Sequence, residues 1–413
     1  MPRLPDTVDS GELDAGQPLG VYVHFPFCSV HCPYCDFAVE VRDEIPHDRY
    51  ADAVITEIAA RRAWFAGAPM VSIYFGGGTP GLWRPSCVAR IVESAREAFG
   101  APPASALEIT IEANPGELDA AQSAALRAAG VNRLSLGVQS FDDRLLGIIG
   151  RNHRSDAAIA AVQAARAAGI DNISCDLMFG LPEQDMDAWR RSVDTLLALR
   201  PDHVSAYALT IERGTPFGAL DRARRLPRPD DDLVAAMAEW GRDALAAAGF
   251  AQYEVSSYAR PGRRAVHNSL YWRLAAFLGV GASASSFRPL LDGSGFRFAN
   301  PRATNSYLRA AASDRGSPAP AHAEKRTARD LESEAVWLGL RTSDGIDRLR
   351  HRQRYGLDPI DGREAAAAHC VRAGWLVVSD AGLTVTPSGF LFADEVARRL
   401  WDRSPLPPRP LRL

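Results

Sequence analysis

Short apolar runs alternate with helical patterns through the first half of the 413-residue chain. Each run is rich in β-branched or aromatic residues and ends in glycine, proline or a polar residue, as buried strands do. The segments between the runs are alanine-rich and repeat apolar positions at helical spacing. The predicted strands are residues 21–25, 71–75, 107–112, 133–138, 173–178 and 203–209. The predicted helices are residues 50–63, 86–99, 119–129, 156–168 and 187–199.

Six successive strand-then-helix units predict an α/β fold with a parallel sheet, either doubly wound and open or closed into a full or partial barrel. Chemically unusual residues lie at or just beyond the carboxyl end of every predicted strand. They are Cys28, residues 76–80, residues 112–115, Gln139, Asp176 and Thr210. A barrel brings all such ends to one mouth, whereas an open sheet brings together only those near its switch point. Because six units are fewer than eight, we predict an incomplete (β/α)6 barrel.

The pattern changes after Gly249. Residues 252–258 predict a further strand, and the Ser-, Pro-, Ala- and Gly-rich residues 313–322 predict a linker. A helical pattern at 360–373 is followed by two short apolar runs around a turn within 374–387, which is typical of a winged-helix-like α+β module. This module lacks a strongly basic recognition helix, so a packing or lid domain is favoured over a nucleic-acid reader. The predicted boundaries are 1–18 (flexible tail), 19–250 (partial barrel), 251–315 (extension) and 316–405 (winged-helix-like domain).

The composition narrows the class of protein. A net charge of −3 and an isoelectric point near 6.3 predict no general attraction to nucleic acid or anionic lipid. No apolar run approaches the length that spans a bilayer, and no signal peptide precedes Leu19. Cys87, Cys175 and Cys370 are scattered, unlike the disulfide framework of a secreted protein. We therefore expect a reduced, cytoplasmic protein with no transmembrane segment and no nucleic-acid partner.

The other three cysteines, Cys28, Cys32 and Cys35, form a C-x3-C-x2-C loop directly after the first apolar run. Clustered thiolates suit zinc or an iron–sulfur cluster. A cubane cluster has one ligand position per iron, so three cysteines would leave one iron open to a small molecule. The alternative is a structural zinc site that adds His24 or His31, but such sites usually pair two cysteine knuckles, and no second one is present.

The second predicted strand ends in F-G-G-G-T-P at residues 75–80. Consecutive glycines let the backbone approach a ligand closely. No Gly-Lys-Ser/Thr follows, so this is not a phosphate-binding loop. Together with the cysteine loop, this run resembles the radical S-adenosylmethionine (radical SAM) superfamily. The resemblance implies a [4Fe-4S] cluster whose open iron binds SAM and whose electron cleaves it to a 5′-deoxyadenosyl radical.

Further segments resemble the family of the oxygen-independent coproporphyrinogen III oxidase (HemN) and its relatives, from about Gly20 to the end of the chain. They are residues 22–28, 32–37, 111–116, 137–141 and 176–182. The resemblance implies that Cys28, Cys32 and Cys35 bind the cluster. It implies that SAM is held by Tyr22, Gly77, Gly78, Thr79, Glu112, Gln139, Arg151 and Asp176. Taken singly, Glu112 or Asp176 could equally be a helix cap.

One departure from the oxidase pattern separates two branches of the family. The oxidase branch carries a further cysteine where this chain has Phe37, and the present pattern resembles the haem chaperones of the HemW branch. H-N-x-x-Y-W at residues 267–272 resembles that branch's haem-associated motif, which makes His267 a candidate haem ligand. The alternative is that His267 is a structural histidine in a turn beside core aromatic residues, with its ring nitrogens hydrogen-bonded within the protein.

Three functions follow from these patterns. The first is a haem chaperone that binds haem as cargo and passes it to apo-haemoproteins such as respiratory enzymes, with transient contact at a membrane surface. The second is an enzyme, a coproporphyrinogen III dehydrogenase that oxidatively decarboxylates propionates, against which Phe37 argues. The third is a structural zinc protein. Homodimer formation is left open.

Overall fold

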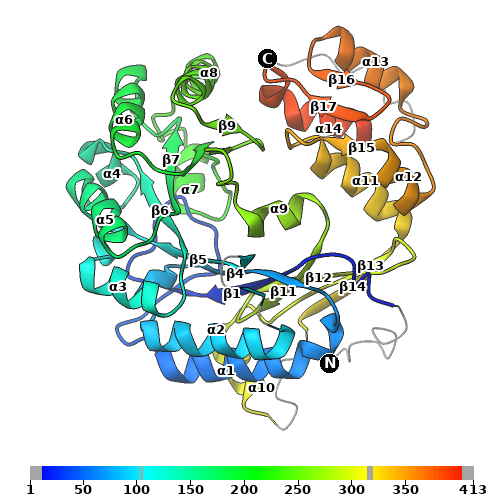
Figure 1. Cartoon of the computed structure of the whole chain (residues 1–413). Coiled ribbons are helices and arrows are strands. Elements are labelled where there is room, and N and C mark those ends of the chain that lie inside the picture. Colours follow the sequence, from blue (N-terminus) through cyan, green and yellow to red (C-terminus); the bar gives the residue numbers. More distant parts are fainter. Residues whose placement is uncertain (1–11, 101, 104–105, 314–319, 402–413) are drawn as a thin grey trace.

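A computed structural model describes residues 12–100, 102–103, 106–313 and 320–401, and its central feature is one large mixed sheet (Figure 1). The strand order is β14-β13-β12-β11-β1-β4-β5-β6-β7-β8-β10-β9. All six predicted strands are confirmed and run parallel in the middle of this order. Their bounds are β1 (Leu19–Phe25), β4 (Met70–Gly77), β5 (Glu108–Ala113), β6 (Arg133–Gln139), β7 (Ile173–Phe179) and β8 (His203–Ala208).

Additional strands extend both edges of the parallel core. A seventh parallel strand, β11, pairs with β1, and antiparallel strands follow on either side. Their bounds are β9 (Ala251–Gln252), β10 (Ser257–Ala259), β11 (Ala276–Val280), β12 (Ser285–Pro289), β13 (Gly295–Ala299) and β14 (His322–Arg326). Among the described strands the order has two free ends, so the sheet curves without closing, which confirms an incomplete barrel.

The prediction of one strand at residues 252–258 is wrong, because the segment divides into β9 and β10. Between them the chain turns toward the C-terminal part of the protein. Glu254 forms an isolated antiparallel bridge with Thr342, and the Val255 amide donates to the Arg341 carbonyl oxygen at 3.1 Å. A tertiary contact therefore divides the segment Q-Y-E-V-S-S-Y, which the local sequence pattern predicts as one strand.

Most helices of this part of the chain lie on the outer face of the sheet (Figure 1). On α2, Val88, Ile91 and Val92 recur at helical spacing and are buried against the sheet. The side chains of Asp119 and Asp185 cap α3 and α6 by accepting hydrogen bonds from free amides of the first turn. The helices are α1 (His47–Arg61), α2 (Pro85–Phe99), α3 (Ala120–Ala128), α4 (Asp143–Ile148), α5 (Ser155–Ala167), α6 (Met186–Ala198), α7 (Pro216–Arg222), α8 (Asp231–Ala247), α9 (Val266–Trp272) and α10 (Thr304–Ala311).

The C-terminal part is a smaller α+β unit with its own core, as predicted for a winged-helix-like module. Its three-stranded sheet has the order β15-β17-β16, and its helices pack around buried Val336, Leu376 and Val396. Arg363 donates to both carboxylate oxygens of Glu332 inside this core. The elements are α11 (Ala328–Gly339), β15 (Ile346–Asp347), α12 (Arg348–Tyr355), α13 (Glu364–Arg372), β16 (Leu376–Val378), β17 (Gly382–Val385) and α14 (Ala393–Trp401).

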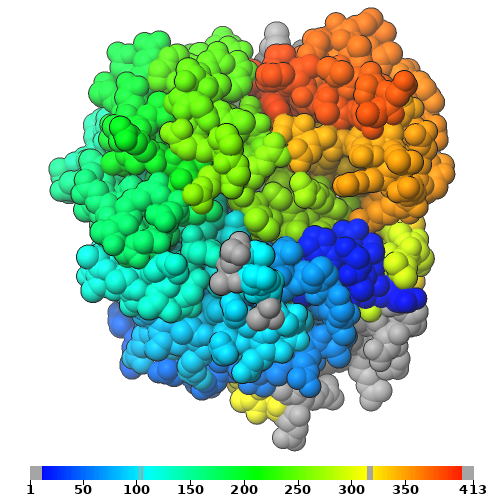
Figure 2. Space-filling model, in the orientation of Figure 1, coloured from blue at the N-terminus to red at the C-terminus, as the bar shows by residue number. Residues whose placement is uncertain are grey.

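The C-terminal unit packs directly on the barrel. In the space-filling view its orange and red residues lie against the green residues around α8 and α9 (Figure 2). Glu334 of α11 pairs with Arg297 of β13 and Arg326 of β14, which anchors this helix to the sheet edge. The helix α9 contacts β4 on one side and α11 on the other, so it lies between the barrel and the C-terminal unit.

The predicted tail and linker lie partly outside the described residues. Residues 1–11 of the predicted flexible tail lie outside the described residues, as does most of the predicted linker at 313–322. Leu13, within the predicted tail, is buried and forms a bridge with Leu290, so the tail is anchored from there on. The four domain boundaries otherwise stay predictions. No helix in the described ranges is both long enough and apolar enough to cross a membrane.

Candidate functional site

A cavity of about 790 Å³ occupies the inside of the partial barrel and opens at the carboxyl ends of the strands. This volume lies in the range of ordinary small-molecule sites. The cavity wall contains all three loop cysteines and every residue predicted to hold SAM. These are Cys28, Cys32, Cys35, Tyr22, Gly77, Gly78, Thr79, Glu112, Gln139, Arg151 and Asp176. The fold therefore brings together residues that are spread over some 150 positions of the sequence.

The cysteine loop is held between two short paired strands, β2 (Phe27–Cys28) and β3 (Glu40–Val41). Thr79 Oγ1 donates to Cys28 Sγ at 3.5 Å, and Arg151 Nη1 lies 3.7 Å from Cys32 Sγ. Burial raises the pKa of Cys28 to about 11 in the free loop, against the smaller lowering effect of the hydrogen bond from Thr79. Because iron binds the thiolate, loading the loop must displace this proton.

The glycine run is shaped by the cysteine loop. A Cβ on Gly78 would lie 2.6 Å from the Phe27 carbonyl oxygen and 2.9 Å from Cys28 Sγ. Gly77 has a φ of +114°, which a side chain would disfavour, and its amide donates to Glu112 Oε2 at 3.2 Å. Only glycine allows the backbone to pass this close to a thiolate ligand, so the run and the loop form one structure.

The geometry fits a cluster better than a single zinc ion. Across the described residues, no group of three His, Cys, Asp or Glu side chains converges on one ion position. A cubane cluster binds each thiolate to a different iron, so its ligands need not converge. The proposed zinc ligand His24 has both ring nitrogens engaged, by the Tyr22 hydroxyl at 3.0 Å and the Ala38 carbonyl oxygen at 3.2 Å. The zinc alternative therefore lacks a fourth ligand at His24.

Two buried carboxyl groups face each other across the barrel interior. The pKa of Glu112 is raised to about 7, chiefly by burial and to a smaller extent by the charge of Asp176. Burial likewise raises the pKa of Asp176 to about 6, while hydrogen bonds from Ser205 and Ser135 lower it. The positive charge of Arg133 acts in the opposite direction to burial on both groups without restoring their ordinary pKa values. A cationic ligand with hydroxyl groups, such as SAM, has the charge and donors that these carboxylates would accept.

Two further predicted residues are held at the mouth by the strand ends. Gln139 ends β6 with a φ of +65°, an uncommon conformation for a residue with a side chain, and its Oε1 accepts from the Tyr207 hydroxyl at 3.0 Å. Arg151 Nη2 donates to the Gly137 carbonyl oxygen at 2.8 Å and to the Asn114 side chain. The guanidinium is therefore fixed beside Cys32, where it can accept a carboxylate next to a bound cluster.

The structure revises the expectation for His267. Its side chain is 0% exposed and does not line the cavity. Nδ1 and the Ser72 hydroxyl are 2.8 Å apart, Nε2 and the Tyr271 hydroxyl are 2.8 Å apart, and the ring stacks on Tyr74. Burial lowers the pKa of His267 to about 3, so it is neutral. No ring nitrogen is free for iron, and the arrangement is that of a satisfied core histidine.

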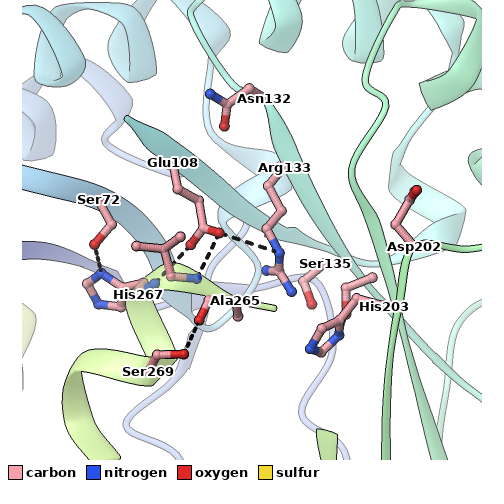
Figure 3. A network of polar contacts seen from close by, with 12 residues as sticks. Ser72, Glu108, Asn132, Arg133, Ser135, Asp202, His203, Ala265, His267 and Ser269 are labelled. Carbon is pink, nitrogen blue, oxygen red and sulfur yellow. Dashed lines mark hydrogen bonds and ion pairs between the residues drawn. The ribbon is translucent and has the colours of Figure 1, made fainter. Parts of the chain in front are cut away.

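The neighbours of His267 in the motif do reach the cavity. Asn268, Tyr271 and Trp272 line its wall, while Phe37, which replaces the oxidase cysteine, lies 64% exposed at its mouth. The sequence reasoning also missed Arg133, a buried arginine at the start of β6 that lines the interior (Figure 3). The strand reads R-L-S-L-G-V-Q, an alternating pattern that gives no local signal that this arginine is buried.

Comparison with known proteins agrees with this geometry. Residues 22–196 match the model of the Radical SAM superfamily, and residues 327–392 match that of the HemN C-terminal domain. The "Heme chaperone HemW" of Synechocystis is 36% identical over 80% of this chain and 79% of its own length. The chain belongs to the HemW family of the radical SAM superfamily. This membership implies a [4Fe-4S] cluster and SAM as its cofactors.

Other members and relatives extend the comparison over nearly the whole chain. The "Heme chaperone HemW" of Mycobacterium tuberculosis is 35% identical over 93% of this chain and 95% of its own length. A solved structure of coproporphyrinogen III oxidase (HemN) from Escherichia coli superposes with a TM-score of 0.80 over 95% of this chain and 92% of that one. Its sequence identity is 24%, so this likeness shows the fold alone: a radical SAM α/β barrel with a HemN-type C-terminal domain.

Proposed function

We propose that this protein is a haem chaperone of the radical SAM type, which binds a [4Fe-4S] cluster, SAM and haem and delivers haem to apo-haemoproteins. The observation that carries the proposal is the single cavity that joins the cysteine loop, the glycine run and the exposed face of the H-N-x-x-Y-W helix. Phe37 stands where the oxidase pattern has its additional cysteine, which supports the chaperone over the dehydrogenase.

In this proposal Cys28, Cys32 and Cys35 hold the cluster, and the remaining cavity residues position SAM. When bound, the cluster supplies one electron for reductive cleavage of SAM. Arg151 is placed to bind the carboxylate of the methionine moiety beside the cluster. Glu112 and Asp176, both buried, accept hydrogen bonds from hydroxyl or ammonium groups and balance positive charge.

We propose that haem lies against the cavity-facing side of α9 and that His267 is not its ligand. Tyr271 and Trp272 offer aromatic faces to a porphyrin, while His267 holds Tyr271 in place through its hydroxyl. His267→Gln keeps hydrogen-bonding groups but removes the imidazole. We expect it to leave the absorption spectrum of bound haem unchanged, whereas Trp272→Ala weakens haem binding and Trp240→Ala, on α8 outside the cavity, does not. A changed haem spectrum in His267→Gln would restore the axial-ligand reading.

The proposed function also implies proteins that accept haem and a place in the cell. We infer a cytoplasmic protein that hands haem to respiratory apo-haemoproteins and contacts the membrane surface only transiently. A homodimer is a further proposal, which size-exclusion chromatography with light scattering tests on the cluster-loaded protein.

One anaerobic preparation tests the function. Half is titrated with haem and mixed with apomyoglobin, and half is incubated with SAM, a reductant and coproporphyrinogen III. We expect stoichiometric haem binding and transfer, with no protoporphyrinogen formed. The variant Cys28→Ala controls for the cluster, and Cys175→Ala controls for cysteine removal. Catalytic formation of protoporphyrinogen would contradict the chaperone function and favour the dehydrogenase.

A further inference from the structure

Arg133 is a buried arginine whose guanidinium has no hydrogen-bond partner among the described residues. It opens β6 at the inner end of the barrel and is 2% exposed, yet it belongs to the cavity wall. Its nearest carboxylate, on Glu108, lies 3.9 Å from Nε, and Nε itself is buried without an acceptor. A guanidinium presents planar donors in a fork that suits a carboxylate, and leaving them unmade inside a protein is unfavourable.

The surrounding groups are already committed to other partners. Glu108 accepts from the amides of Val266 and His267 at 2.9 and 3.0 Å, which ties it to the start of α9 (Figure 3). His203 bonds through one ring nitrogen to Ser174 and through the other to Tyr253, both at 2.8 Å. His267 is likewise satisfied on both nitrogens. Among the described residues none accepts a hydrogen bond from Arg133, whose charge acts over a longer distance on the cavity carboxyl groups of Glu112 and Asp176.

Arg133 is also placed apart from the arginine expected to bind SAM. Arg151 lies at the mouth, where it contacts Cys32 and the end of β6. Arg133 lies at the opposite end of the same strand, next to the helix that carries Tyr271 and Trp272. The cavity thus contains one arginine beside the cluster loop and a second at its inner end.

We propose that Arg133 is the anchor of a carboxylate subsite at the inner end of the cavity, and that the carboxylate it binds is a propionate of haem lying against α9. This assignment rests on the proposed function and adds to it the group that orients the cargo. The other candidate ligand is the carboxylate of SAM, which would form the same bidentate pair with the guanidinium.

The test compares two ligands that differ only in their carboxylates. Wild type, Arg133→Met and Arg133→Lys are titrated with haem and with haem dimethyl ester, followed by absorbance. The wild type is expected to prefer haem by about 10- to 100-fold, the value of a charge-assisted hydrogen-bonded pair. Arg133→Met should abolish this preference, and Arg133→Lys, which keeps the charge without the fork, should retain part of it.

A matched control removes an arginine elsewhere. Arg260 stacks on Phe250 and donates to the Pro201 carbonyl oxygen outside the cavity, so Arg260→Met should bind haem and the ester as the wild type does. Thermal unfolding of ligand-free protein supplies a readout that does not depend on activity. Arg133→Met should unfold below the wild-type temperature, because it leaves the buried carboxylate of Glu108 without its ion-pair partner, whereas Arg133→Lys keeps the positive charge.

The remaining outcomes separate the subsite from the proposed function. Equilibrium dialysis of SAM with cluster-loaded wild type and Arg133→Met forms the second arm. A tenfold loss of SAM affinity with haem unaffected would support the carboxylate subsite and assign it to SAM. If the wild type binds no haem, the chaperone function fails, and the SAM arm alone decides the subsite. The proposal is overturned if Arg133→Met changes neither affinity more than Arg260→Met does. If Arg133→Met does not fold, Arg133→Lys takes its place in the comparison. A preference for haem over haem dimethyl ester as large in Arg133→Lys as in the wild type then overturns the proposal.

Discussion

Glu112→Gln should stabilise the ligand-free protein in a pH-dependent manner. The carboxyl group of Glu112 accepts from the Tyr74 hydroxyl at 2.6 Å and from the Gly77 amide at 3.2 Å. Glutamine preserves both contacts, because its oxygen can accept from Gly77 while its amide group donates to the Tyr74 oxygen. What the substitution removes is a buried group that must lose a proton as the pH rises.

The magnitude follows from linkage. Burial raises the pKa of Glu112 from 4.5 to about 7. An acid whose pKa is higher in the folded state contributes stability that is fully present below pH 4.5 and is lost as the pH rises through about 7. At about 1.36 kcal/mol for each pH unit between the two values, the wild type loses about 3 kcal/mol across this window. Glutamine does not titrate, so its advantage grows over the same range and levels off above it.

Calorimetric unfolding of the ligand-free protein at several values between about pH 5 and pH 8 measures this difference. After about 1 kcal/mol is allowed for poorer hydrogen-bond geometry, we expect a gain near 2 kcal/mol at the alkaline end and none at the acid end. Glu93→Gln, which replaces an exposed carboxylate on α2, serves as the control. A gain that is independent of pH, or a loss at pH 8, would refute the reasoning.

Three shorter predictions concern the cluster loop and the C-terminal unit. Alanine at any one of the loop cysteines should reduce iron bound after anaerobic reconstitution to background, whereas Cys175→Ala, in buried β7, should leave it unchanged in iron and sulfide analysis. Gly78→Ala should give the same loss of iron, because its Cβ would lie 2.6 Å from the Phe27 carbonyl oxygen, a backbone atom that cannot move aside. Arg363→Met should lower the free energy of unfolding of the C-terminal unit by about 3–5 kcal/mol, measured by urea denaturation, because it removes the guanidinium that binds both oxygens of Glu332.

The parallel core could be predicted because its strands are buried on both faces and read as continuous apolar runs. The start of β6 at Arg133 matches the predicted boundary, and its end differs by one residue. The strand β11 was missed because Ala-Phe-Leu-Gly-Val contains a glycine and lies in a stretch of small residues. Its glycine, Gly279, is required by a close approach: a Cβ there would lie 2.1 Å from the Ser285 carbonyl oxygen. Only the pairing with β1 and β12 reveals such a strand.

The site was predictable where the chemistry is local. The spacing of the cysteines and the run of glycines are visible in short segments. Because the carboxyl ends of barrel strands surround one mouth, polar residues at those ends are expected to meet there. Arg133 was not predictable in this way, because a charge in an alternating pattern is normally read as exposed. Only the structure shows that Arg133 is buried. It also shows that Glu108, the carboxylate nearest to Arg133, already accepts hydrogen bonds from backbone amides of α9.

The role of the H-N-x-x-Y-W segment depends on which side of α9 each residue occupies. Asn268, Tyr271 and Trp272 are related by steps of three and four, so they share one face of the helix, and all three line the cavity. His267 lies one position earlier, on the side packed against β1 and β4, where Gly20 leaves room for its ring. Its bond to Tyr271, four residues on, links the buried side to the cavity side. The histidine therefore serves the ligand face by holding α9 in register with the sheet. A replacement that cannot bond to Tyr271, unlike glutamine, should weaken haem binding through the position of Tyr271.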